Sequence, residues 1–477
     1  MKFVSPEHKL HILRKEGCGK VHEAALKIIA EIGVVVGSKR VIKRLLDVGA
    51  KDKGNGLICI SPEIIEKSLQ TVPSQFKLFS VNGQEAMDIN KKSMYFGVST
   101  SSLGYIDPYT GKKIAHTSET SANMARVADG LGNIDYVGNG GLLADVDPRI
   151  GGRMNVSNTL RYTTMPMYFC PDYAESYVDV IKLAQDIVGG EKNLREKPFL
   201  FGYCEPVPPL HLSGDSLDKL IICGEAGVPV VYMPYSMRGG TAPITLASAL
   251  AQNFAEILAG LTIHQLFCPG APFIPGSMPT IMDMRTTIGS YGAPEFCFGI
   301  NLSSEICDFY NLPFFGTAGS TDSQHMDMQS ASEVTMSILS TLLSGADIVH
   351  DTGVMEHASA LSPELLVYTD EILDMLKIFQ EEVDLSEEAF MFDVIKEIGP
   401  RGNYLQHEST LLNFKQIWYS KIFERRLSGE SKANIFAEKI RAKTINIIEN
   451  HYNLEINPKI LPILLEHEKK WAKLIEK

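Results

Sequence analysis

Apolar and polar residues follow two different patterns along the middle of the chain. Short apolar runs of strand length recur between residues 94 and 352, and each is followed by a longer segment with an apolar residue at every third or fourth position. The short runs predict buried parallel strands, and the longer segments predict the helices that connect them. The predicted strands are residues 94–98, 136–143, 167–170, 199–204, 230–235, 273–277, 314–319 and 348–352. Eight such units predict a TIM (β/α)8 barrel of the α/β class.

The predicted helices between these strands have the length that a parallel crossover connection requires. They lie near residues 121–131, 154–162, 177–188, 217–226, 246–267, 295–310 and 332–343. An open doubly wound sheet would use the same units, but no G-x-G-x-x-G motif opens a helix in this sequence. Because 477 residues exceed what a single core usually fills, we expect a barrel with additions.

The additions are expected at both ends of the chain. Residues 1–90 predict a small N-terminal segment of helices and a short strand, and residues 91–378 the catalytic barrel. Residues 379–477 are strongly charged and predict a C-terminal helical extension, with a break at Gly399-Pro400. We expect both end segments to pack around the barrel and not to form a second catalytic domain.

The loop after the seventh predicted strand is the first candidate for an active-site wall. Asp322, Gln324 and His325 follow this strand closely, and ligands of α/β folds bind where parallel strands end. We predict a catalytic role for these three side chains. The alternative is that Ser320, Thr321 and Asp322 cap the next helix while the rest of the loop faces solvent.

The distribution of charge limits the chemistry of the barrel. Between Leu220 and Leu376 the chain has no lysine, and its only arginines are Arg238 and Arg285. A Schiff-base aldolase needs a lysine and a phosphate site usually needs Lys or Arg, so both lose support. Because acids are retained in this region, a cationic substrate gains support. Burial of the strands and helices explains part of the lysine deficit.

Aromatic residues lie at or near several predicted strand ends. A quaternary ammonium ion is held by aromatic faces with a carboxylate nearby, since it cannot form a conventional hydrogen bond. Phe96, Tyr168, Tyr203 and Tyr232 are candidates for such a cage, and Glu205 is the candidate carboxylate. The alternative is that each aromatic side chain fills the core.

Composition restricts the partners and the compartment. The net charge of −12, without a basic aromatic cluster, argues against nucleic acid or a membrane surface as the main partner. The eight cysteines have no C-x-x-C spacing and suit reduced, buried thiols in a cytoplasmic protein. No apolar leader or membrane-spanning run is recognisable in the sequence. We expect small molecules or proteins as partners.

Several short motifs together resemble the trimethylamine methyltransferase family. G-G-T-A-P-I-T-L-A at 239–247 is followed by P-G-A-P at 269–272, G-S-M-P at 276–279, D-M-R-T at 283–286 and T-D-S-Q at 321–324. The resemblance continues at residues 26–50, 370–373 and 393–400, so it covers nearly the whole chain. G-G-T-A-P alone would be weak, but the joint set is specific.

The resemblance implies a TIM barrel that transfers a methyl group from a methylated amine to the cobalt of a separate corrinoid protein. Trimethylamine enzymes of the family carry pyrrolysine, whereas every position here is a standard residue. Other members demethylate quaternary amines such as glycine betaine, proline betaine or carnitine. We therefore expect a betaine-type substrate, a corrinoid protein as partner, no metal or cofactor held by this chain, and a homo-oligomer.

A betaine also carries a carboxylate, for which the barrel offers few cations. Arg238, His325 and His350 are the candidates, all near predicted strand ends. Arg285 is a further candidate, although a structural ion pair is the stronger expectation for it. Two other readings are a barrel lyase with Asp322 and His325 as acid and base, and a quaternary-amine-binding module without catalysis.

Overall fold

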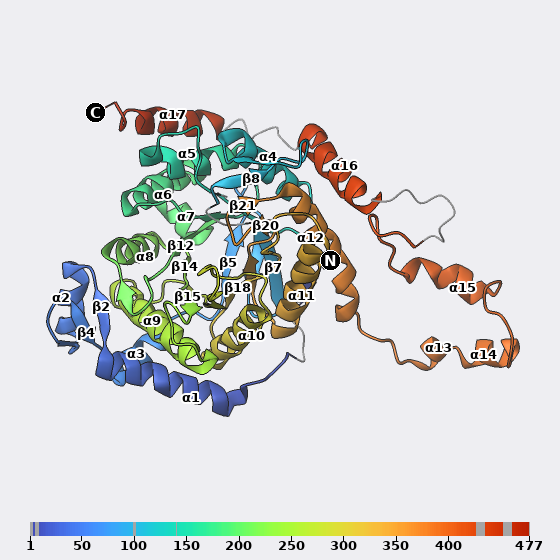
Figure 1. Ribbon diagram of the computed structural model, residues 1–477, viewed down its shortest axis with the longest axis horizontal. Coiled ribbons are helices and arrows are strands. Elements are labelled where there is room, and N and C mark those ends of the chain that lie inside the picture. Colours follow the sequence, from blue (N-terminus) through green and yellow to red (C-terminus); the bar gives the residue numbers. More distant parts are fainter. Residues whose placement is uncertain are drawn as a thin grey trace.

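A computed structural model describes residues 3–4, 9–98, 102–139, 141–425, 435–451 and 460–476. Within these residues, eight parallel strands form a barrel surrounded by helices (Figure 1). The strands are β7 (Ser93–Val98), β10 (Tyr136–Gly138), β11 (Met167–Phe169), β12 (Leu200–Cys204), β14 (Val230–Tyr232), β16 (Phe273–Pro275), β18 (Phe315–Thr317) and β19 (Ile348–His350). Each strand lies beside its neighbours in the sequence, and a parallel bridge between Gly276 and Phe315 closes the ring. The predicted barrel is confirmed.

In the described part of the chain, eight helices cover the barrel, and the seven between strands overlap the predicted ranges. They are α4 (Ser118–Asp129), α5 (Pro148–Leu160), α6 (Ala174–Val188), α8 (Gly214–Ala226), α9 (Leu246–Phe267), α10 (Pro294–Phe309), α11 (Met328–Ser344) and α12 (Pro363–Leu376). Several predicted strands extend beyond the observed ends, and the one at residues 136–143 does so most. It ends at Gly138, because the Asn139 side chain accepts the N–H of Cys170 at 3.0 Å and Gly141 has a positive φ of 122°.

Aromatic side chains fill the lower part of the barrel. Phe201 and Phe315 lie on strands three places apart around the ring, yet their ring centroids are 6.2 Å apart. These two side chains therefore meet across the interior. Tyr136 contacts Phe201 at 5.3 Å, and Gly97 leaves the room for its ring, since a Cβ on Gly97 would lie 2.5 Å from it. Above this filled floor, open space lies toward the carboxyl ends of the strands.

The N-terminal segment packs against one side of the barrel. Its elements are α1 (Arg14–Lys27), η1 (Ile28–Ile32), β2 (Val34–Val36), α2 (Lys39–Asp47), β3 (Lys51–Asp52), β4 (Leu57–Cys59), α3 (Pro62–Leu69), β5 (Phe76–Phe79) and β6 (Glu85–Ile89). Helices α1 and α3 lie on α9. Strand β2 pairs with β13 (His211–Leu212), which follows barrel strand β12, so the segment shares a sheet with the barrel rim.

Extra strands build the rim at the carboxyl end of the barrel. Strand β15 (Tyr235–Arg238) follows β14 and pairs with β17 (Met278–Ile281), which follows β16. A second sheet joins β8 (Gly104–Ile106), β9 (Lys113–Ala115), β20 (Val354–Met355) and β21 (Ala360–Leu361). These strands are not among the predicted ones, because runs of two to four residues carry too little periodicity.

The C-terminal extension begins with η2 (Lys377–Gln380) and leaves the barrel sideways (Figure 1). Residues 381–417, here called the arm, hold α13 (Glu387–Phe390), α14 (Phe392–Ile398), α15 (Glu408–Asn413) and η3 (Phe414–Gln416). After the arm, α16 (Ile435–Asn450) packs on α12 and α4, and α17 (Leu461–Ala472) packs on α5 and α6.

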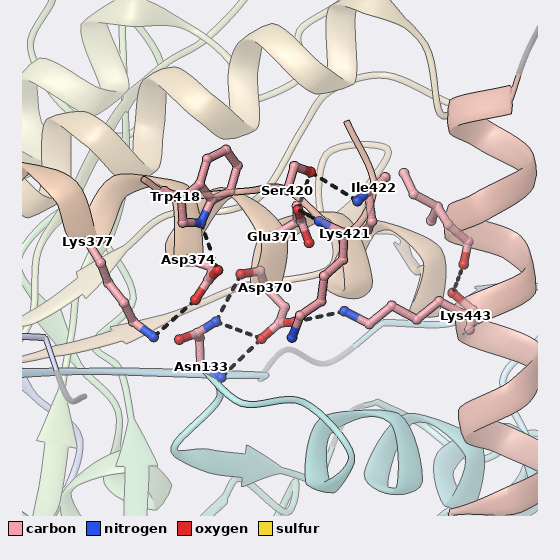
Figure 2. A network of polar contacts seen from close by, with 12 residues as sticks. Asn133, Asp370, Glu371, Asp374, Lys377, Trp418, Ser420, Lys421, Ile422 and Lys443 are labelled. Carbon is pink, nitrogen blue, oxygen red and sulfur yellow. Dashed lines mark hydrogen bonds and ion pairs between the residues drawn. The ribbon is translucent and has the colours of Figure 1, made fainter. Parts of the chain in front are cut away.

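The arm follows α12 and η2 in the chain, and the residues directly after it return to α12, as Figure 2 shows. The indole N–H of Trp418 donates to Asp374 at 2.9 Å. The hydroxyl of Ser420 and the backbone N–H of Lys421 both donate to Glu371, the latter at 3.0 Å. The arm therefore leaves the barrel after α12 and returns to the same helix.

Helix α9 is long and apolar enough to cross a membrane by length and composition alone. In its most apolar window, 83% of the residues are buried inside the protein. It runs under the N-terminal segment and against the barrel, which is the place of a core helix.

Candidate active site

The open space above the aromatic floor is a cavity of about 480 Å³, here called the tyrosine cavity. Its wall carries four tyrosines, two carboxylic acids and one histidine: Tyr168, Tyr203, Tyr235, Tyr291, Glu205, Asp351 and His350. These residues come from β11, β12, β15 and β19 and from the segments that follow β12, β17 and β19. The cavity thus lies at the carboxyl end of the barrel, where enzymes of this fold bind their substrates.

The tyrosines are arranged in two groups. Tyr168 lies 5.4 Å from Tyr203 and is nearly parallel to Phe315, at 6.0 Å and 6°. On the side of the rim, Tyr235 and Tyr291 stack at 5.9 Å and 20°. The faces of such rings attract a cation. Hydrocarbon side chains would fill the same space without this preference.

Glu205 brings one carboxylate into the cavity, directly after β12. The hydroxyl of Tyr203 donates to its Oε2 at 3.0 Å. The side chain contacts the solvent of the cavity, yet protein surrounds it on most sides, and this desolvation raises its pKa. A positive charge inside the cavity would lower that pKa again.

His350 and Asp351 form a buried pair at the end of β19. The Nδ1–H of His350 donates to the carbonyl of Gly316 at 2.7 Å, and its ring stacks on Phe315 at 4.4 Å. This bond leaves Nε2 facing Oδ2 of Asp351 at 3.3 Å. Asp351 has a positive φ of 70°, which L residues rarely adopt, and its Oδ1 has no hydrogen-bond partner among the described residues.

Burial decides the protonation of this pair. It lowers the pKa of His350 to about 4 and raises the pKa of Asp351 well above its usual range. Without a ligand, the favoured state is therefore a neutral imidazole beside a neutral carboxylic acid. A cation near Asp351 would favour its ionised form, because an opposite charge within roughly 4–6 Å stabilises a carboxylate.

Asp322 lies behind the wall of the cavity and not in it. Its carboxylate accepts the backbone N–H of Tyr291 at 2.7 Å, the hydroxyl of Ser290, and Nδ1–H of His357 at 2.8 Å. Burial alone would raise the pKa of Asp322, but these bonds together lower it, while the same contact raises the pKa of His357. Asp322 therefore holds Tyr291 in the wall of the cavity by accepting its backbone N–H.

Gln324 and His325 are exposed and line a different cavity of about 490 Å³, here called the outer cavity. Its other walls include Met326, Met328 and Phe436 of α16. The structure therefore does not bring Gln324 and His325 together with the tyrosines. Their predicted catalytic role remains a prediction without support from the tyrosine cavity.

Two of the predicted cage residues point away from the barrel interior. Side chains alternate along a strand, and Gly97 faces the interior, so Phe96 faces the surrounding helices. Tyr232 contacts Phe273 at 6.1 Å, and Gly260 of α9 leaves room for its ring, since a Cβ there would lie 2.3 Å away. Both are buried core residues, as the alternative reading of the aromatic positions expected.

The two arginines also lie outside the cavity. Along β15, Tyr235 and Met237 line the cavity, and Arg238 faces the other side of the strand. Arg238 is buried, and its Nε has no hydrogen-bond partner among the described residues. Arg285 is exposed, and Asp283 accepts its backbone N–H at 2.7 Å.

Sequence reasoning did not find Asp351 and did not single out Tyr291. Asp351 directly follows His350 at a strand end, so its place in the sequence was a usable signal. Tyr291 lies in the loop after β17, where no periodicity predicts the direction of a side chain. Its backbone bond to Asp322 and its stacking on Tyr235 show how it is placed.

A model of the family described as trimethylamine methyltransferase (MTTB) matches residues 2–464. The chain belongs to this family. The trimethylamine methyltransferase family resemblance seen in the motifs is thereby confirmed, and the protein is an enzyme, a methyltransferase of this family.

Curated relatives match over most of their length. A glycine betaine methyltransferase of Desulfitobacterium hafniense (strain Y51) is 27% identical over 463 residues, covering 95% of each chain. The trimethylamine methyltransferase MttB of D. hafniense (strain DSM 10664 / DCB-2) is 26% identical and covers 90% of this chain and 88% of its own. The family thus includes relatives named for different amines.

A solved structure supports the fold alone. The hydroxylamine complex of MtmB superposes with a TM-score of 0.53 at 9% identity, covering 93% of this chain and 89% of that one. Among the described residues of the present family member, no three His, Cys, Asp or Glu side chains gather into a group that could hold a metal ion. These residues therefore offer no preformed donor set.

Proposed function

We propose that the enzyme demethylates a quaternary amine and transfers the methyl group to the Co(I) of a corrinoid carried by a separate protein. The observation that carries this proposal is the composition of the tyrosine cavity. It offers aromatic faces and two carboxylic acids to its ligand, and no lysine or arginine lies among its lining residues. Such a wall fits a permanent cation better than an anion or a phosphate.

The chemistry of the transfer suits this wall. The methyl carbon forms a bond to cobalt while its bond to nitrogen breaks, and the bonding electron pair stays on the nitrogen. A quaternary nitrogen already carries the charge that lets a neutral tertiary amine leave, so no proton has to be supplied. The protein then has to orient one N-methyl group toward the mouth and to exclude water.

The tyrosines and acids perform this orientation. Tyr168 and Tyr203 offer faces deep in the cavity, with Glu205 and Asp351 as counter-charges beside them. The mouth at the carboxyl end of the strands is the side from which a corrinoid protein would approach. The relative named glycine betaine methyltransferase adds support for a quaternary amine in this family.

The test is a direct transfer assay. The purified enzyme is incubated with reduced Co(I) corrinoid protein and a panel of quaternary amines, and methyl-Co(III) is followed by absorbance. We expect transfer from at least one quaternary amine and little from trimethylamine. Equally fast transfer from trimethylamine would contradict the leaving-group argument. Turnover of substrate without any corrinoid would favour a lyase, and binding without turnover a binding module.

The lyase reading has little support in the geometry. It needs Asp322 and His325 to act on one substrate as acid and base. Asp322 is bound to His357, Ser290 and the backbone of Tyr291, and His325 lies in the outer cavity. Neither the tyrosine cavity nor the outer cavity is lined by both side chains.

We further propose that the enzyme is a homo-oligomer in which the arm contacts a second copy. The arm exposes many large apolar side chains, among them Val383, Leu385, Phe392, Leu405 and Leu412, each at least 69% exposed. It holds eight acidic and three basic residues, whereas residues 14–53 hold ten basic and five acidic ones. These oppositely charged segments lie on different sides of the barrel (Figure 1), so the arm of one copy suits the N-terminal segment of another.

Light scattering after gel filtration tests this association. Replacing Phe392 and Leu405 by Asp should produce a monomer at low micromolar concentration. Val178 of α6 is also exposed, and Val178→Asp serves as the matched control. A monomeric wild type, or an unchanged mass after the arm substitutions, would contradict the proposed contact.

A further inference from the structure

We infer that the substrate is a quaternary amine whose fourth substituent is uncharged, such as a hydroxyalkyl or alkyl group, and that carboxylated betaines are disfavoured. This inference rests on the proposed demethylation of a quaternary amine and narrows its substrate class. It departs from the betaine-type substrate expected from the family resemblance.

The cationic side chains near the cavity either point away from it or are paired with other protein groups. Arg238 faces the other side of β15. Lys219 of α8 forms an ion pair with Asp215 at 2.8 Å and donates to the carbonyl of Asp172 at 2.7 Å. His357 is paired with Asp322 at 2.8 Å. None of these three side chains is among the lining residues of the tyrosine cavity.

His350 is the one basic side chain in the described wall, and both of its ring nitrogens face other protein groups. Its Nδ1–H donates to the carbonyl of Gly316 at 2.7 Å, and Nε2 faces Asp351 at 3.3 Å. Full burial against Phe315 disfavours its protonated form. A ligand carboxylate would therefore meet no positive charge at this position.

The charged groups that the described wall does present are acids. Once a quaternary ammonium enters, Glu205 and Asp351 are stabilised as carboxylates, because the cation offsets their desolvation. A betaine would place its own carboxylate a few ångströms from the ammonium, in the same cavity. Like charges at that distance repel strongly where water is scarce. The wall thus attracts the ammonium end of a betaine and repels its carboxylate end.

Uncharged polar groups in the wall suit a hydroxyl. Tyr235 and Tyr291 line the rim of the cavity, and burial raises the pKa of Tyr235 to about 12, so its hydroxyl remains a donor. The Thr241 hydroxyl accepts the N–H of Met237 at 2.9 Å and keeps its own proton to donate. Such donors would bond to a hydroxyl or to a carboxylate, so the acids decide the preference.

Choline and glycine betaine form the matched pair for a test. Both carry a trimethylammonium group on a two-carbon chain, and they differ in a terminal hydroxyl or carboxylate. We expect kcat/KM for methyl transfer to be at least about tenfold higher for choline, which corresponds to ~1.4 kcal/mol of discrimination. Calorimetric titration of the wild-type enzyme with each compound should show the same order of affinity.

Neutral variants of the two acids test the cause. Glu205→Gln and Asp351→Asn should each lower kcat/KM for choline. They should also bring the ratio of kcat/KM for choline to that for glycine betaine toward one. Glu23 is exposed on α1, and Glu23→Gln is the matched control that should leave the ratio unchanged. If a variant fails to fold, the wild-type titration still decides the preference.

The outcomes separate the two proposals. Equal or faster transfer from glycine betaine, or an unchanged ratio in both acid variants, would overturn the inference while leaving quaternary-amine demethylation in place. Absence of transfer from every quaternary amine, with active corrinoid protein present, would instead overturn the proposed function.

Discussion

The tyrosine cavity and the outer cavity have similar volumes, about 480 and 490 Å³, but very different walls. The first is built by strand ends and rim strands, with acids and tyrosines facing inward. The second lies between the loop after β18 and α16, and exposed Met328 and partly buried Phe436 contribute to its wall. Gln324 and His325 thus face a different space from the substrate-binding candidates. Substitutions in both walls test which of the two cavities performs the chemistry.

The largest effect is expected at Asp351. Asp351→Asn keeps the shape of the side chain but removes the charge that would meet the ammonium. Because a hydrogen bond or contact to a charged group contributes ~1.5–3 kcal/mol, kcat/KM should fall by roughly one to two orders of magnitude. Transfer kinetics with the preferred quaternary amine measure this. An activity within twofold of wild type would remove Asp351 from substrate recognition.

A smaller effect is expected at the tyrosines that would surround the ammonium group. Tyr203→Leu removes one aromatic face and the donor to Glu205, so KM should rise by roughly 2- to 30-fold, in line with ~0.5–2 kcal/mol for a cation–π contact. Tyr232→Phe is the control, because that ring faces α9 and not the cavity. The prediction would be wrong if the two substitutions changed KM equally.

Asp322 should affect stability in a pH-dependent way. The raised pKa of His357 means that its contribution is present below its usual 6.5 and is lost as pH rises through the folded value. The lowered pKa of Asp322 means that its contribution is present above the usual 3.8 and is lost in acid. Asp322→Asn should therefore cost more stability at about pH 6 than at about pH 9, by ~0.5–1 kcal/mol, since His357 is partly exposed.

Urea unfolding of wild type and Asp322→Asn at both pH values measures this difference. His357→Gln should reproduce the loss of pH dependence. A constant difference between wild type and Asp322→Asn across the range would show that the ion pair contributes nothing measurable.

The smallest effect is expected in the outer cavity. His325→Ala removes an exposed side chain that does not reach the tyrosine cavity, so kcat and KM should stay within about twofold of wild type. A loss of kcat by a factor of ten or more would instead favour the loop as the catalytic element. It would also support Asp322 and His325 as acid and base.

Local pattern was sufficient for the scaffold of this protein. Apolar runs predict each barrel strand and its helix, because burial between the core and a helix layer requires a continuous apolar segment. The lysine-free stretch from Leu220 to Leu376 already indicated a cationic ligand. Tyr168, Tyr203, Glu205 and His350 were also named from their positions near strand ends, and all four line the cavity.

Only the tertiary structure decided which side chains share the cavity. Phe96 and Tyr232 are aromatic and near strand ends like Tyr168, but a shift of one residue along a strand turns a side chain to the opposite face. Tyr291 and Asp322 meet through a loop whose path no periodic pattern describes. Sequence alone therefore determined the barrel and predicted a cationic ligand. The direction of each side chain depended on register and loop closure, which contacts between distant residues establish.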